Sequence, residues 1–197
     1  MTNRRFPSTP TPPGERGVTV LELVIAMALL ALVVGSVYGM IATGARSARV
    51  TNDLVQTQAQ VRAALDNLVD ESRWAQAVTA ASATSVTLLI PQATPFAAGS
   101  PYTVTFAYDA ANRTLTRQVD IDASGPLPPG AAQPVAYRVV TSTGGDGLAL
   151  EYFDAAGTSL GSTPADLAAI ARVRITVTTT WDNFSRTFAG DAALRAR

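Results

Sequence analysis

The feature that most constrains this chain is an uncharged apolar run from Leu23 to Ala45, with a single carboxylate, Glu22, directly before it. As a helix that rises ~1.5 Å per residue, the run is about 35 Å long, and the hydrocarbon core of a bilayer is about 30 Å thick. We therefore predict a membrane-spanning helix. Glu22 is the exception, because an ionisable group at mid-depth costs about 2.5–3.5 kcal/mol and usually marks a functional position.

The distribution of charge predicts an orientation for this helix. Residues 1–17 carry three arginines and one glutamate, whereas the whole chain has a formal net charge of zero. Because basic residues gather on the cytoplasmic side of a span, we expect residues 1–17 in the cytoplasm and residues after 45 on the far side. The prolines in residues 1–15 indicate an unfolded leader. The rest of the chain is slightly acidic, which gives no electrostatic footprint for nucleic acid.

Composition excludes several kinds of chemistry. Cysteine, histidine and lysine are absent, so all fifteen basic residues are arginine. Disulfides, thiolate or imidazole metal sites, and mechanisms that need Cys, His or Lys are therefore excluded. An enzyme would need a pair of carboxylates, and no pair is marked by its surroundings. We expect no enzyme activity, no metal and no cofactor.

Beyond residue 45 the sequence predicts that the helix continues to about residue 80. Leu54, Val61, Leu65 and Leu68 recur at helical spacing and form one apolar stripe. The charged residues fall elsewhere on the helical wheel: Arg62, Asp66, Asp70, Glu71 and Arg73. The stripe most simply packs against the domain that follows.

Residues 81–197 predict a head domain built on an antiparallel β-sheet. Apolar residues alternate with polar ones in several short segments, which is typical of strands, and turn residues 109–112 join two of them in a hairpin. The segment from Thr163 resembles a helix start, and residues 125–134 read as a loop. The expected strands are residues 86–90, 102–108, 114–121, 137–141, 148–153 and 173–181. The predicted fold is α+β, with a helix over residues 18–80 packed on this sheet.

The N-terminal motif resembles a known signal. Residues Gly17-Val18-Thr19-Val20-Leu21-Glu22, followed by the apolar run, resemble the class III signal of type IV pilins and type II secretion pseudopilins. In that family a prepilin peptidase cleaves after the glycine, and the new N-terminus is methylated. The resemblance implies cleavage between Gly17 and Val18 and N-methylation of Val18. Val18 departs from the Phe or Met that the family usually has there, which concerns the efficiency of processing more than the cut.

Glu22 has a physical rationale in such a protein. Cleavage would create an amine on Val18, about 6 Å away along a helix, and a buried carboxylate is stable only when it is paired. In a bundle of staggered copies, each Glu22 could pair with the amine of a neighbour and fix the register of assembly. The alternative is a capping box, in which Thr19 and Glu22 serve the helix N-terminus. Both roles can coexist.

Two other interpretations of the apolar run remain open. A secretory signal could be cleaved after Ala45, although the run is longer than the ~7–15 apolar residues of such signals. The run could also be an uncleaved single-pass anchor. The resulting alternative function is an exported or membrane-anchored β-rich binding module that forms no filament.

Several segments of the head resemble the J-type minor pseudopilins and related minor pilins. They are residues 65–77, 115–117, 150–157, 170–175 and 188–195. The resemblance implies a minor subunit of a type II secretion, type IV pilus or competence filament. Its partners would be other pilin or pseudopilin subunits, prepilin peptidase and the inner-membrane assembly platform. The expected location is the inner membrane, with one span and the head in the periplasm or outside the cell.

Weaker patterns have simpler explanations. Three arginines, Arg113, Arg117 and Arg138, could gather on one sheet face as a DNA contact, but the sequence favours solvated arginines and no nucleic-acid partner. Acidic residues near 109–112, 120–122 and 146 lack the dense oxygen ligands of a calcium loop, so turn chemistry is the better interpretation. Trp74 and Trp181 are expected in the core or between the helix and the sheet.

Overall fold

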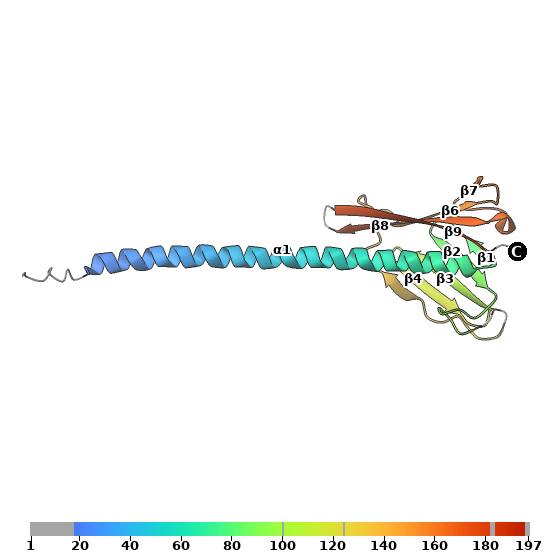
Figure 1. Cartoon of the computed structure of the whole chain (residues 1–197), viewed down its shortest axis with the longest axis horizontal. Coiled ribbons are helices and arrows are strands. Elements are labelled where there is room, and N and C mark those ends of the chain that lie inside the picture. Colours follow the sequence, from blue (N-terminus) through green and yellow to red (C-terminus); the bar gives the residue numbers. More distant parts are fainter. Residues whose placement is uncertain (1–17, 100, 124, 182–183, 196–197) are drawn as a thin grey trace, which may run out of the picture. The chain divides into compact units, whose positions relative to one another are not determined.

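The structure is a computed structural model that describes residues 18–99, 101–123, 125–181 and 184–195. The chain divides into two compact units, residues 1–49 and 50–197. The helix α1 (Val20–Trp74) belongs to both units, and the strands follow it (Figure 1). The leader expected over residues 1–17 lies outside the described residues.

The helix in the first unit has no packing partner of its own. Every described residue from 18 to 49 is exposed, and α1 is long and apolar enough to cross a membrane by length and composition. A helix that is apolar on all sides requires apolar surroundings, either lipid or other helices.

In the second unit α1 buries one stripe, as the spacing predicted. Val61 and Leu68 are fully buried, and Leu65 is nearly so. The helix ends at Trp74, so the predicted end at residue 80 is wrong. The Ala75 N–H closes a tight turn on the Ser72 carbonyl (3.1 Å), and the Gln76 N–H already donates to the Leu89 carbonyl of a strand (2.9 Å). Sheet pairing therefore begins where helical periodicity alone favoured a continuing helix.

The first sheet has five antiparallel strands in the order β1-β2-β3-β4-β5. Alternating burial along β2 and β3 places one face of this sheet in the core. The predicted hairpin is confirmed, since β3 and β4 pair from Asp109 and Thr114 outward. The strands are β1 (Ala77–Ala81), β2 (Ser85–Ile90), β3 (Tyr102–Asp109), β4 (Thr114–Asp120) and β5 (Gln133–Ala136).

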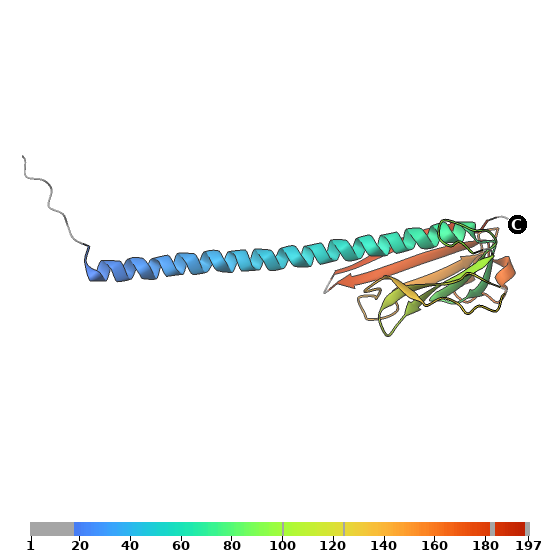
Figure 2. The same cartoon turned by 90° about the horizontal axis from the view of Figure 1, so that it is seen from below.

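A second antiparallel sheet, ordered β7-β6-β8-β9, completes the head, which therefore holds two sheets where one was expected. Its strands are β6 (Leu148–Phe153), β7 (Ser159–Gly161), β8 (Arg172–Trp181) and β9 (Phe184–Ala193). The two sheets are linked through Tyr152, whose hydroxyl donates to the Ser82 carbonyl (3.0 Å) and approaches that of Ser85 (3.2 Å). Figures 1 and 2 show strands of both sheets alongside the second half of α1.

One local prediction was wrong and another was right only in part. The strand expected at 137–141 contains only isolated bridges, and the strand β5 lies just before it and overlaps the end of the expected loop. The reason is Arg138, whose φ of 57° interrupts extended backbone. The short helical turn expected after Thr163 is present as a single 3-10 turn, η1 (Leu167–Ala169). Its cap is Asp166, whose carboxylate accepts the Ala168 N–H at 2.9 Å, and not the expected Thr163.

The core lies where α1 meets both sheets, which confirms the α+β fold. On the second sheet the helix lies against Gly190 of β9, where a Cβ would lie 2.8 Å from the Val69 Cγ2 atom. A side chain there would push the helix away from the strand. On the first sheet α1 also makes a polar contact, between Glu71 and Arg117.

Candidate functional site

The first turn of α1 is built by Thr19. Its hydroxyl accepts the backbone N–H of Glu22 at 3.2 Å, and its carbonyl accepts the N–H of Leu23 at 3.1 Å. The second bond is the first regular bond of the helix, and the first satisfies the Glu22 N–H, a donor that a helix start otherwise leaves without a partner. The Thr19 half of the predicted capping box is therefore present.

Glu22 lies in this first turn, where the helix dipole favours a negative charge. Its neighbours are exposed apolar side chains, with Val20 and Leu21 at 80% and 69% exposure. Among the described residues Glu22 forms no ion pair. The carboxylate thus has a favourable place on the helix, and residues 18–99, 101–123, 125–181 and 184–195 place no cation within ion-pair distance of it.

The predicted cleavage position lies at the edge of the described chain. Gly17 is outside the described residues, and Val18, two residues before the helix, is 71% exposed. Val18 and Thr19 are not helical, so the bond before Val18 does not lie within the hydrogen-bonded helix. Proteolysis favours exposed backbone outside regular structure.

The apolar surface after Glu22 extends around the whole helix. Large side chains on every face are exposed, for example Leu29, Leu30 and Leu32 at 60–70%. A Cβ atom added at Gly35, Gly39 or Gly44 would meet nothing within 4 Å, and small residues of this kind let helices approach closely in lipid. This surface fits lipid, or equivalent helices, as its surroundings.

Arg117 has a structural role in the head. Its Nε atom donates to the Glu71 carboxylate at 3.1 Å, and its Nη2 atom donates both to that carboxylate and to the Phe96 carbonyl (3.3 Å). Glu71 is fully buried, so the prediction that it lies on the polar face of the helix was wrong. Burial raises the pKa of Glu71, and Arg117 opposes that rise by hydrogen bonding and charge.

The three arginines considered for DNA do not form one group. Arg113 and Arg138 line the same hollow, whereas Arg117 is engaged with Glu71. The guanidinium carbon of Arg138 lies 3.5 Å from the centroid of the Trp181 ring.

Trp181 is partly exposed and Trp74 is 40% exposed, so neither tryptophan is a buried core residue.

Asp109, from one of the acidic clusters considered for calcium, stabilises a turn. The Asp109 carboxylate accepts the N–H groups of Ala111 (2.9 Å) and Asn112 (3.1 Å) and the Asn112 side-chain amide (2.7 Å). The hydrogen bond from the Asn112 side chain is the largest cause that lowers the pKa of Asp109. In the described ranges, no three residues of the types Asp, Glu, His and Cys gather closely enough to hold a metal ion.

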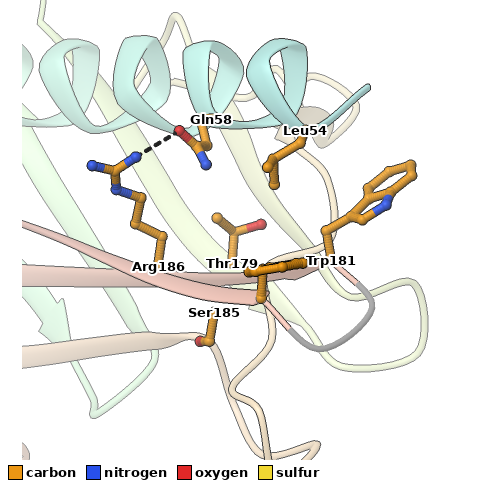
Figure 3. A pocket seen from close by; sticks show the side chains of 7 residues that line it. Leu54, Gln58, Thr179, Trp181, Ser185 and Arg186 are labelled. Atoms are coloured by element: carbon orange, nitrogen blue, oxygen red, sulfur yellow. Dashed lines mark hydrogen bonds between the residues drawn. The ribbon is translucent and has the colours of Figure 1, made fainter. Parts of the chain in front are cut away.

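Sequence reasoning missed a small hollow between α1 and the β8–β9 hairpin (Figure 3). Leu54 and Gln58 point from the helix toward the strands, and Arg186 reaches back to donate to the Gln58 side-chain oxygen at 3.0 Å. These residues are 128 positions apart, and no local pattern could have paired them.

Comparison with known proteins identifies the N-terminal segment. Residues 13–38 match the family described as "Prokaryotic N-terminal methylation motif". No curated protein and no solved structure matched the chain. The matched residues include the predicted cleavage position, the Thr19 cap, Glu22 and the first part of the apolar helix. The chain thus carries the N-terminal methylation motif that is typical of type IV pilin-like proteins.

Proposed function

We propose that this protein is a minor pilin or pseudopilin subunit that is cleaved after Gly17 and assembles into a type II secretion or type IV pilus filament. The observation that carries the proposal is the match of residues 13–38 to the methylation motif. The helix start adds support, because Thr19 begins α1 directly after the proposed cut and places Glu22 in the first turn.

The role proposed for Glu22 is to contact a neighbouring subunit. Cleavage would create the Val18 amine, and the described residues offer Glu22 no other cation. A charge without a partner in apolar surroundings is unfavourable. Pairing with the amine of an adjacent subunit removes that penalty and fixes the register between the two helices.

The assignment to a minor subunit is supported by the head segments that resemble J-type minor pseudopilins. We propose a single-pass inner-membrane location before assembly, with residues 1–17 in the cytoplasm and the head on the far side. The partners would be sibling subunits, prepilin peptidase and the assembly platform. No enzymatic role is proposed for the head.

Processing is tested by mass spectrometry of the mature N-terminus in a host with and without prepilin peptidase. We expect a chain that begins at Val18 and carries a methyl group only when the peptidase is present. A chain that begins at Arg46 would instead identify a secretory signal. An intact N-terminus in both hosts would identify a permanent anchor. Either of these two results contradicts the proposal.

Assembly is tested with Glu22→Gln, which removes the charge and keeps the size of the side chain. We expect normal cleavage and loss of incorporation into filaments that contain the sibling subunits. Thr19→Ala is the matched control, because it weakens the helix cap and keeps the carboxylate. Equal defects in the two variants would show that Glu22 acts only as a cap, and normal incorporation of Glu22→Gln would refute the pairing.

A further inference from the structure

Two arginines on the head share a hollow that has no role in the function proposed above. Arg113 lies in the turn between β3 and β4, and Arg138 follows β5. Both are exposed, and the hollow is lined by Asn112, Arg113, Tyr137, Arg138, Val140 and Thr180. The fold therefore places arginines from two different loops along one hollow.

The backbone at both positions is unusual. Arg113 has a φ of 52° and Arg138 a φ of 57°, and these are the two non-glycine residues with positive φ in the described ranges. A long side chain rarely adopts this conformation, whereas glycine and asparagine do so readily. Strained residues of this kind cluster at functional sites. The turn geometry alone gives no reason for arginine at either position.

Hydrogen bonds hold both strained residues in place. The Arg113 carbonyl accepts the N–H of Val139 at 2.9 Å. The Arg138 carbonyl accepts the Thr179 hydroxyl at 3.0 Å and approaches the Thr180 N–H at 3.4 Å. The two arginines are thus tied to each other through the backbone and to β8.

The Arg138 side chain is held by an aromatic ring, and neither arginine is in an ion pair with a carboxylate that the structure describes. The Arg138 guanidinium stacks on Trp181 at 3.5 Å, which fixes its plane and leaves the N–H groups at its edge available. Neither Arg113 nor Arg138 forms an ion pair with a carboxylate of the described residues, whereas Arg73, Arg117 and Arg174 do. The nearby Asp109 carboxylate is occupied by its own turn.

We propose that Arg113 and Arg138 bind a carboxylate on an acidic segment of a partner protein. Guanidinium groups bind carboxylates through paired, charge-assisted hydrogen bonds. Exposed Tyr137 adds an apolar and hydrogen-bonding wall to the hollow. This binding site stands independently of cleavage and filament assembly.

The surrounding charge favours a local carboxylate over a nucleic acid. Residues 50–197 contain ten arginines and thirteen acidic residues, so an extended polyanion would be repelled by most of the unit. Asp109 also lines the adjoining hollow beside Asn112 and Tyr137. A polyphosphate chain that crosses from one hollow to the other would meet this negative charge, whereas a short acidic segment needs only the hollow that Arg113 and Arg138 line.

Binding can be followed through Trp181 in the full-length chain in detergent. The sequence contains two tryptophans, so Trp74→Phe leaves Trp181 as the only fluorescent tryptophan, beside Arg138. The probes are a triglutamate peptide, a triglutamine peptide and an oligothymidylate of similar length. We expect a saturable change in Trp181 emission with triglutamate and none with triglutamine.

The arginines are tested by Arg113→Asn and Arg138→Asn, since asparagine tolerates positive φ and carries no charge. Each should weaken triglutamate binding by about tenfold, while Arg62→Gln on the exposed face of α1 leaves it unchanged. Arg113→Asn should show this weaker binding together with an unchanged or higher melting temperature of the head, because asparagine relieves the backbone strain at positive φ. A purely structural arginine would instead lower that temperature.

Three results would overturn the proposal. The first is oligothymidylate binding more tightly than triglutamate at the same ionic strength, which would identify a nucleic-acid site. The second is equal loss of binding in Arg62→Gln, which would show a general charge effect. The third is no response to triglutamate in the parent protein.

Discussion

Glu22 and Glu71 are two carboxylates on one helix, and each lies among apolar side chains. Glu71 is fully buried and is held by Arg117 from β4. Glu22 is exposed and forms no ion pair within the described residues. The described part of the chain thus supplies a cation for Glu71 and none for Glu22.

The apolar surfaces of the helix show the same contrast. The second half of α1 covers its stripe with the two sheets of the head, whereas the residues before position 50 are exposed on all sides. The contrast indicates that the second half of α1 buries its apolar side chains against the head, whereas the first half needs lipid or other helices around it. Four predictions test that division.

The largest expected effect comes from removing the partner of Glu71. Arg117→Leu should lower the free energy of unfolding of the head by about 3–5 kcal/mol, because it leaves a buried carboxylate unpaired. Urea unfolding of the full chain in detergent, followed by tryptophan fluorescence, measures this, since Trp74 and Trp181 both lie in the second unit. Arg62→Leu, at an exposed position on α1, is the control and should change little.

The defect of Arg117→Leu should grow with pH. Arg117 lowers the pKa of Glu71, so its loss raises that pKa further in the native state. The native state of the variant then binds more protons than the unfolded state over a wider pH range, and its stability falls as pH rises through that range. A defect that is independent of pH would show that lost packing, not the unpaired charge, is the cause.

The second prediction compares equal substitutions in the two halves of the helix. Leu68→Ala should destabilise the head by about 2–5 kcal/mol, because Leu68 is fully buried in the core. Leu30→Ala removes the same atoms from a side chain that is 62% exposed and should leave head unfolding unchanged. A similar loss in both variants would refute the division of α1 into two independent halves.

Glu71→Gln should have a smaller effect, about 0.5–1.5 kcal/mol, because the amide oxygen can still accept from Arg117. Burial raises the pKa of Glu71 above its ordinary 4.5. In the wild type, the native state therefore gains stability from a bound proton below pH 4.5 and loses that stability as pH rises through the native pKa. Glutamine does not titrate, so the deficit of the variant should shrink with rising pH. A deficit that grows with pH would instead show that the ion pair is net stabilising.

The smallest effect is expected at the start of α1. Thr19→Ala removes the acceptor of the Glu22 N–H and should weaken the first turn by about 0.5 kcal/mol. Amide hydrogen exchange of residues 20–24 in detergent should become faster, while urea unfolding of the head stays the same. Unchanged exchange would show that the cap contributes nothing in these surroundings.

Local patterns predicted the parts of the fold that local forces determine. Alternation identified β2, β3 and β8, and the turn at Asp109 identified the hairpin, because each depends on residues close in sequence. The helical wheel predicted the stripe of α1 but assigned Glu71 to the solvent, since its partner lies 46 positions later. The assembly of a second sheet also depends on a longer-range pairing, that of β6 with β8, which joins the β6–β7 and β8–β9 hairpins.

The candidate site shows the same limit. The cap at Thr19 and the exposed run after Glu22 follow from neighbouring residues, and the sequence indicated both. The sequence did not distinguish the three arginines considered for DNA. In the structure Arg117 pairs with Glu71, whereas Arg113 and Arg138 line a shared hollow. No composition or spacing distinguishes them, because the difference arises from the tertiary fold.

The end of β9 has a consequence for the order of folding. The Arg195 N–H donates to the Ala75 carbonyl at 3.0 Å, directly after the last turn of α1, and Ala192 is part of the core. The stripe of α1 therefore stays incompletely covered while the chain is being synthesised up to this strand. Contacts between such distant positions form slowly, so the head should complete its folding after synthesis of residues 184–195, and until then part of the stripe of α1 lacks its cover within the chain.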